Sequence, residues 1–174
     1  MYEAKKLKTW SGFQRLKDRH WDSVVSARAR NKILVLTSSV GPHELMAGWD
    51  DDVVVCMGET YAANNAANEE LIVSLLESAE EHGYDRNLCP YMKAYVGSMY
   101  SGRSFTGKFT RPDICVADVQ SPTHGQWLQR VSEHLNIPYF ALSHVYWTDV
   151  MGDHHIDYYV TQFYEFIEWM EKQT

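Results

Sequence analysis

The sequence contains three cysteines, Cys56, Cys89 and Cys115, whose thiols could pack, attack an electrophile or bind a metal. We expect the chain to work in the cytoplasm, where an odd number of cysteines argues against a disulfide framework. Cys115 lies inside the apolar run ICVADV, where a free cysteine usually packs as a small hydrophobe. Cys56 and Cys89 are therefore the two candidates for chemistry.

Cys89 stands in the stretch NLCPYMKAYVG, directly before Pro90. Proline is favoured at the first position of a helix, so we expect Cys89 at a helix N-terminus. The helix dipole there favours the thiolate, which is the form that binds metal or acts as a nucleophile. An iron–sulfur cluster needs several thiolates, and its negative charge also suits a helix N-terminus. The residues alone leave four roles open for Cys89: packing, nucleophilic attack, half of a disulfide, or ligation.

Four apolar runs that alternate with helix-like segments must position these side chains. The runs predict strands at 31–40, 51–59, 114–119 and 137–143. Helices are expected at 3–30, 42–49, 60–83, 90–102, 121–136 and 155–172. This alternation indicates a three-layer α/β domain with a parallel sheet, of the Rossmann or flavodoxin kind. We expect residues 1–30 to form an N-terminal helical arm and residues 31–174 to form the α/β domain.

Polar side chains follow the ends of the predicted strands, and parallel sheets bind ligands outside the carboxyl ends of their strands. Glu44 begins the helix after the first strand, where it either complements the helix dipole or faces a ligand at this edge. His154 and His155 are adjacent, so they would point about 100° apart on a helix, which favours a surface helix start over a metal site. The edge is expected to carry Ser38, Ser39, Cys56, Glu59, Gln120, Ser121, Ser143 and His144.

Charge and hydropathy exclude several classes of function. The net charge of −7 argues against general binding to nucleic acid or to an anionic membrane surface. No stretch has the apolar length of a membrane span, and residues 1–8 lead into no apolar core of a signal peptide. The sequence also has no dinucleotide-binding glycine fingerprint, no nucleophile-elbow motif and no phosphate-loop motif.

The first thirty residues are basic, in contrast to the rest of the chain. We expect either a solvated helical arm or a docking surface for an acidic partner or a phosphorylated ligand. In the first interpretation four apolar side chains pack down onto the domain. These are Trp10, Phe13, Leu16 and Trp21.

Residues 58–99 resemble a stretch of the benzoyl-CoA reductase / 2-hydroxyacyl-CoA dehydratase family. Residues 111–142, which begin RPDICVADV, are similar to the strand, helix and strand that follow in that family. The resemblance extends over about residues 32–145 and is most specific around Cys89. The matching residues of the first stretch are Glu59, Ala79, Glu80, Gly83, Tyr84, Asn87, Leu88, Cys89, Tyr91, Met92, Lys93 and Gly97.

The resemblance implies a subunit that pairs with a homologous second large subunit, each carrying a [4Fe–4S] cluster. An ATP-dependent iron–sulfur activator supplies a low-potential electron, and the pair reduces an aromatic acyl-CoA ring or eliminates water from a 2-hydroxyacyl-CoA. Cys89 is then a cluster ligand and Cys56 its partner. Members of the family are longer, so the chain would be the N-terminal half of a subunit. The acyl-thioester site is expected to involve Ser38, Ser39, Glu44 and Glu59.

The stretch around Cys89 favours the benzoyl-CoA reductase over the 2-hydroxyacyl-CoA dehydratase. One departure from the family concerns the first cysteine, which many members carry near the positions of Asn64 and Asn65. Its absence keeps open a cluster-free structural subunit that holds a catalytic partner. A further alternative is a stand-alone α/β domain that binds a nucleotide or a small phosphorylated ligand.

Overall fold

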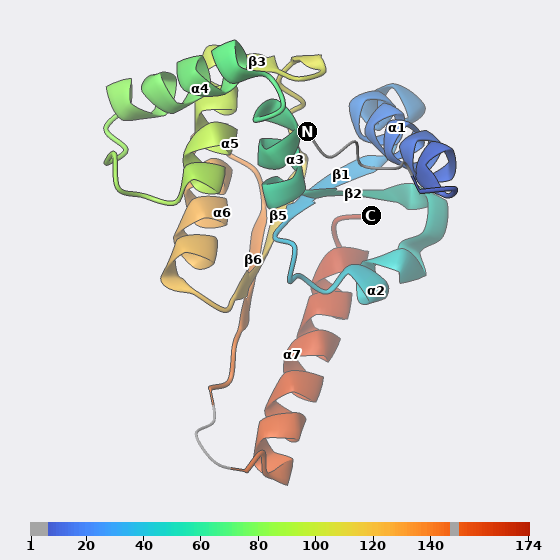
Figure 1. The fold of residues 1–174 in the computed structure, drawn as a ribbon. Helices are drawn as coiled ribbons and strands as arrows, with labels where there is room; N and C mark the ends of the chain where they lie inside the picture. Colours follow the sequence, from blue (N-terminus) through green and yellow to red (C-terminus); the bar gives the residue numbers. More distant parts are fainter. Residues whose placement is uncertain (1–6, 147–149) are drawn as a thin grey trace.

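The computed structural model describes residues 7–146 and 150–174, and its centre is a parallel four-stranded sheet (Figure 1). The strand order is β2-β1-β5-β6, so the chain starts in the inner strand β1, continues to the edge strand β2, and then crosses to β5 and the other edge, β6. This arrangement confirms the expected α/β fold with a parallel sheet. The strands are β1 (Ile33–Thr37), β2 (Val53–Met57), β5 (Ile114–Val119) and β6 (Tyr139–Ser143).

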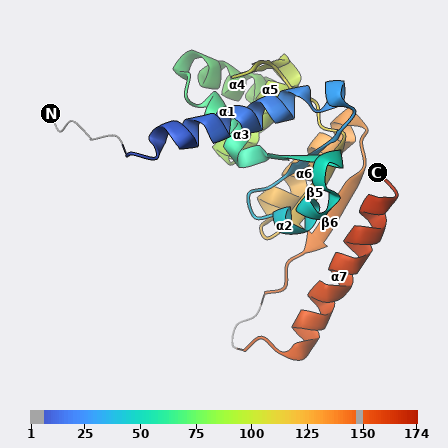
Figure 2. The same ribbon diagram turned by 90° about the vertical axis from the view of Figure 1, so that its right-hand side faces the viewer.

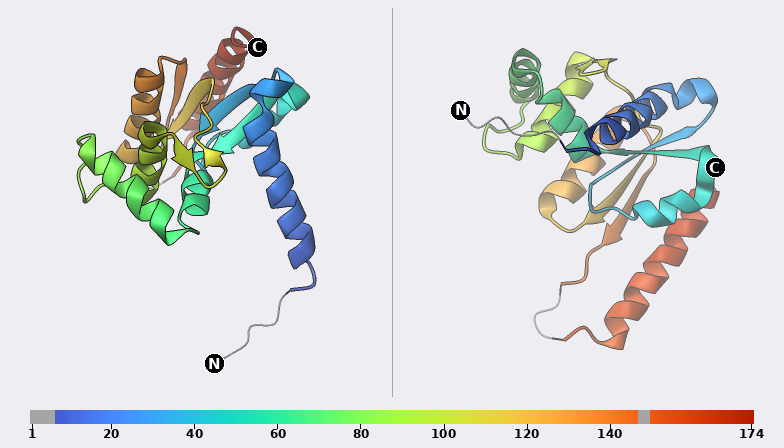
Figure 3. Two further views of the ribbon diagram at one scale, coloured as in Figure 1. Left: turned by 90° about the horizontal axis from the view of Figure 1, so that it is seen from above. Right: turned by 45° about the vertical axis from the view of Figure 1, so that its right-hand side comes forward.

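Helices cover both faces of this sheet, as Figure 3 shows from two further directions. One face packs against α1 (Trp10–Ser26), α3 (Gly58–Asn65), α5 (Pro90–Ser101) and α6 (Pro122–Leu135). The other face packs against α2 (His43–Met46) and α7 (Asp153–Glu171). α4 (Glu69–Glu81) lies outside α5 and contributes Ala79 to the first core. The layers explain why the strands are apolar on both sides, since each face is buried.

Alternate residues of each strand enter different cores because side chains of a strand point to opposite faces. In β1, Leu34 and Leu36 pack with the helices of the first face, whereas Val35 packs with Phe166 and Met170 of α7. β5 repeats the pattern with Cys115 and Ala117 on the first face and Ile114 and Val116 on the second. The strands therefore hold two separate cores together.

Two predicted elements differ from the structure. The helix expected over 60–83 is two helices, and Asn68 starts the second by accepting a hydrogen bond from the Leu71 N–H at 3.0 Å. An N-cap residue needs non-helical backbone angles, so the chain must break its helix there. The expected loop over 101–113 contains a short antiparallel pair, β3 (Arg103–Ser104) and β4 (Gly107–Lys108).

The N-terminal helix α1 runs outward from the sheet (Figure 2). Trp21 and Val24, near its C-terminal end, are buried in the first core. The expectation that all four apolar residues of this arm pack down is wrong for three of them: Trp10 is 45% exposed, Phe13 57% and Leu16 62%. The part of α1 that carries them extends past the sheet. Residues 3–6 of the expected helix lie outside the described residues.

None of the helices in the described part of the chain is long and apolar enough to cross a membrane. The last helix, α7, has Gly152 as its N-cap and Asp153 as its first residue, two residues before the expected start at 155. Gln162 joins α7 to β6, because its side chain accepts from the Ser143 N–H at 2.6 Å and donates to the Ser143 carbonyl at 3.1 Å.

Candidate functional site

The carboxyl ends of the four sheet strands bring together polar side chains from distant parts of the sequence. Each lies at the end of a parallel strand or in the turn that follows, which is where ligands bind in such sheets. Ser38 and Ser39 follow β1, Glu59 follows β2, and His144 follows β6; β5 contributes Asp118 and the residues that open α6, Ser121 and His124. We call this group the carboxyl-edge cluster.

Glu59 connects two elements of the carboxyl-edge cluster. Its Oε2 accepts the backbone N–H of Ser39 at 2.8 Å, and its Oε1 lies 2.9 Å from Nε2 of His124. Nδ1 of His124 lies in turn 2.9 Å from Oγ of Ser121. The chain of contacts joins the ends of β1, β2 and β5, and the Glu59 side chain stays 16% exposed. Both oxygens of the carboxylate are therefore held in place while the group remains within reach of a ligand.

The close approach of α3 to α6 makes this contact possible. Gly58 precedes Glu59, and a Cβ at position 58 would lie 2.7 Å from the ring of Trp127 in α6. A glycine at this position lets the indole lie against the start of α3. Trp127 is almost fully buried there, so the two helix starts that carry Glu59 and His124 are fixed relative to one another.

Asp118 and His144 form a second acid–base pair in the cluster. Asp118 Oδ1 lies 3.6 Å from Nδ1 of His144, which also contacts the Tyr159 hydroxyl at 3.1 Å. Burial raises the pKa of the Asp118 carboxyl, although the neighbouring imidazoles of His144 and His124 act in the opposite direction. Oδ1 of Asp118 is buried and has no hydrogen-bond partner among the described residues. The edge therefore contains a carboxyl group that binds its proton more tightly than usual.

The other three residues expected at the acyl-thioester site, Ser38, Ser39 and Glu44, lie in three different environments. Ser39 is exposed, whereas Ser38 is fully buried and its Oγ has no hydrogen-bond partner among the described residues. Glu44 is exposed on α2 and lies beside Phe163 of α7, in a shallow depression. The structure therefore brings Ser39 and Glu59 together by a direct hydrogen bond, and it places Glu44 on a separate surface. The catalytic roles of all four residues stay predictions.

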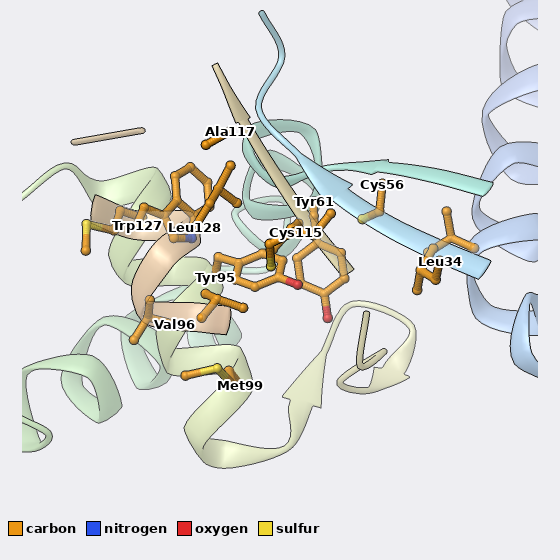
Figure 4. Packing of buried hydrophobic residues seen from close by; sticks show 14 of the residues in the cluster. Leu34, Cys56, Tyr61, Tyr95, Val96, Met99, Cys115, Ala117, Trp127 and Leu128 are labelled. Carbon is orange, nitrogen blue, oxygen red and sulfur yellow. The ribbon is translucent and has the colours of Figure 1, made fainter. Parts of the chain in front are cut away.

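Cys56 and Cys115 lie in one row across the sheet. Leu36 of β1 pairs with Cys56 on one side and with Cys115 on the other, so the two cysteines are two strand spacings apart, about 10 Å. Figure 4 shows both among the rings that cover this face, Tyr61 and Tyr95. Burial raises the pKa of the Cys56 thiol to about 12 and also raises that of Cys115. Both thiols are protonated members of the core.

Cys89 has a different environment. It is the N-cap of α5, as the sequence predicts, with Pro90 as the first helical residue, and it is only partly buried. The loop before it is held by Lys93, whose ammonium group donates to Glu80 at 2.7 Å and to the Arg86 carbonyl at 2.8 Å. Cys89 is therefore the accessible thiol, and a buried cation fixes the loop that presents it.

Comparison with known proteins identifies the family. Residues 42–174 match the model of the family described as 2-hydroxyglutaryl-CoA dehydratase, D-component. The chain belongs to this family. Over 138 residues it is 29% identical to the (R)-2-hydroxyisocaproyl-CoA dehydratase alpha subunit of Clostridioides difficile. The aligned region covers 78% of this chain and 33% of that subunit. The chain thus spans about one third of the curated relative it matches, less than the half that the resemblance implied.

Membership of the 2-hydroxyglutaryl-CoA dehydratase D-component family raises the question of whether these residues fit an iron–sulfur cluster. A cluster is bound by several thiolates, and Cys56 and Cys115 lie inside the packed core. Cys89 is more accessible, but it is a single donor. Within residues 7–146 and 150–174, no group of three or more His, Cys, Asp and Glu side chains could hold a metal ion. These residues alone therefore do not fit the group.

Sequence reasoning missed two members of the carboxyl-edge cluster, Asp118 and His124, and for His124 the sequence contained a signal. Ser121 was expected at the carboxyl edge, and His124 follows it by three residues, at the position whose N–H an N-cap side chain accepts. The Ser121 hydroxyl does accept this N–H, at 3.4 Å. The cap pattern SPTH thus contained a signal, because it places the histidine at the same strand end as Ser121.

Proposed function

We propose that the chain is part of a 2-hydroxyacyl-CoA dehydratase and that Glu59 handles a proton during elimination of water from the acyl thioester. The family and the relative support the dehydratase over the benzoyl-CoA reductase that the stretch around Cys89 favoured. One observation carries the role of Glu59: its carboxylate is held between the Ser39 amide and the His124 imidazole, at the carboxyl edge of the sheet.

The elimination breaks a C–H bond at C3 and the C–O bond at C2, and it leaves an enoyl thioester and water. One proton must leave carbon, and one must reach the departing hydroxyl group. A carboxylate can accept a proton and, once protonated, deliver one, which is the usual work of general acid–base residues. Ser39 holds Glu59 through its backbone N–H, so its hydroxyl group stays available for the substrate.

Cys89 is proposed as a ligand of a [4Fe–4S] cluster whose other donors come from outside the described residues. Bound there, the cluster would supply electron transfer. The proposed partners are a homologous second subunit, which the word "alpha" in the relative's name supports, and an ATP-dependent activator. Cys56 would have to leave the core to serve as a ligand, which counts against it. Anaerobic iron and sulfide analysis of the assembled enzyme tests this point, and protein without iron would favour the cluster-free subunit.

The decisive experiment for Glu59 is Glu59→Gln in the assembled enzyme, assayed anaerobically with a panel of 2-hydroxyacyl-CoA thioesters. We expect kcat to fall by about 10²–10⁴-fold, because the amide keeps the shape but cannot carry the proton. Glu133→Gln on α6 is the matched control, since Glu133 is exposed and pairs only with Arg130 and Gln129. Wild-type kcat in Glu59→Gln would refute the proposed role.

A further inference from the structure

We infer that His124 is a positioning residue that holds Glu59 in its reactive orientation, and that Ser121 fixes the tautomer of His124 for this purpose. The inference rests on the proposed function for the role of Glu59. It rests on this chain's own contacts for the arrangement itself, which can be tested without any activity.

Two contacts on different elements restrict rotation of the Glu59 carboxylate. A carboxylate held by one hydrogen bond can still rotate, whereas the two oxygens of Glu59 have different partners on different elements. The Ser39 N–H comes from the loop after β1 and the His124 ring from the first turn of α6, at 2.8 Å and 2.9 Å. Rotation of the carboxylate would break both contacts. His124 therefore sets which oxygen stays bound and which lone pairs remain available.

The contacts of the His124 ring determine which of its nitrogens carries the hydrogen. Oγ of Ser121 accepts the backbone N–H of His124, and it lies 2.9 Å from the ring Nδ1. A hydroxyl oxygen has one hydrogen and two lone pairs, so it can accept this N–H and still donate its hydrogen to Nδ1. The Glu59 carboxylate can only accept, so the contact at Nε2 requires the imidazole hydrogen on that nitrogen. A neutral imidazole that accepts at Nδ1 carries its hydrogen on Nε2. This is the nitrogen that faces Glu59, so the tautomer matches the contact with the carboxylate.

The contact between His124 and Glu59 is partly shielded from water. The His124 side chain is 24% exposed and the Glu59 side chain 16%. A hydrogen bond to a carboxylate is stronger when water is partly excluded, so the contact is a stronger restraint than a pair on the open surface. A positive charge on the His124 ring would lower the pKa of the Asp118 carboxyl, the second carboxyl group of the cluster.

A spectroscopic experiment tests the arrangement on the 174-residue chain. Nitrogen-15 NMR of the histidine side chains distinguishes the two neutral tautomers, and the His124 signals are assigned by their loss in His124→Gln. We expect wild-type His124 at slightly alkaline pH to carry its hydrogen on Nε2, and Ser121→Ala to shift it to a mixture. A mixture or the opposite tautomer in the wild type would overturn the inference, whatever the activity.

A kinetic experiment on the assembled enzyme separates positioning from proton transfer. His124→Ala should lower kcat by about 10²-fold with little change in KM, as expected when a reactive group is displaced. His124→Gln keeps an N–H donor for Glu59 but cannot carry a proton, so it should recover most of kcat. Glutamine as slow as alanine would overturn the positioning role, provided that circular dichroism shows both variants folded.

The two proposals can fail separately. If Glu59→Gln is fully active, the proposed function of Glu59 fails, and the tautomer of His124 still reports whether the contacts exist. If Glu59→Gln is inactive while both His124 variants keep wild-type kcat, the function stands and the positioning role is refuted. Glu133→Gln remains the control for a change on α6.

Discussion

Cys56 and Glu59 are three residues apart in the sequence, yet their environments differ: Cys56 is buried among apolar side chains, and Glu59 is hydrogen-bonded among polar ones. Cys56 packs in a core where burial raises the thiol pKa to about 12. Glu59, just beyond the end of the same strand, is held by a backbone amide and an imidazole at the edge of the sheet. Over three residues, the chain thus passes from a buried apolar core to a partly exposed polar edge.

The two regions should differ in how much stability a substitution costs. The apolar layer on the side of α3, α5 and α6 is closely packed, although Asn65 Nδ2 and Trp127 Nε1 within it also lack hydrogen-bond partners among the described residues. The carboxyl edge contains buried polar atoms that lack partners among the described residues, namely Ser38 Oγ and Asp118 Oδ1. Such groups reduce stability, and functional sites are where proteins commonly retain them. Because Ser39, Glu59 and His124 of the edge are exposed or partly exposed, substitutions there should cost less stability than substitutions in the closely packed layer.

The largest effect is expected in the apolar layer, from Gly97→Ala in α5. A Cβ at this position would lie 1.8 Å from the Leu75 carbonyl oxygen of α4, a backbone atom that cannot rotate away. The two helices would have to separate, and we expect a loss of about 3 kcal/mol in the free energy of unfolding. Urea unfolding followed by circular dichroism measures it.

Gly48→Ala is the matched control for this substitution, because nothing lies within 4 Å of the added methyl group. Its free energy of unfolding should stay within about 0.5 kcal/mol of the wild type. Equal losses in the two variants would show that the α4–α5 contact is looser than the structure indicates, and the contrast between layer and edge would weaken.

The second prediction separates the three cysteines by reactivity. A disulfide reagent at pH 8 should modify Cys89 in the folded chain and leave Cys56 and Cys115 unmodified, because burial keeps these two thiols protonated. In denaturing urea all three thiols should react, and this signal gives the reference value for three modified cysteines. Cys89→Ser should remove the fast reaction. Fast modification of Cys56 in the folded chain would instead support its role as a cluster ligand.

The sequence predicts the sheet well for a physical reason. Strands buried on both faces are continuous apolar runs, and such runs are visible without a structure. The parallel arrangement then places Ser39, Glu59 and His144 at one edge, as expected. The burial of Cys56 was also accessible, because Cys56 alternates in step with Val54, which shares its core.

The contact between Glu59 and His124 could not be predicted in this way. It depends on β5 lying beside β1 and on Trp127 packing over Gly58, and both are long-range features of the fold. The break between α3 and α4 was missed because alanine and leucine continue at helical spacing across Asn68. The exposed part of α1 was missed because the spacing of apolar residues does not reveal where the sheet ends.

The smallest effect tests the carboxyl edge itself, through Asp118→Asn. Burial raises the pKa of Asp118 in the folded state, so folding favours its protonated form and the ionised form reduces stability above that pKa. Asparagine removes this penalty and should raise the free energy of unfolding at pH 7.5 by less than about 1 kcal/mol. The gain should shrink as the pH falls toward the usual range of aspartate, where the carboxyl group is protonated in both states. Asp157→Asn, on the exposed face of α7, is the control for the substitution and should change the free energy of unfolding by less than about 0.5 kcal/mol. A destabilised Asp118→Asn would mean that the pairing with His144 outweighs burial.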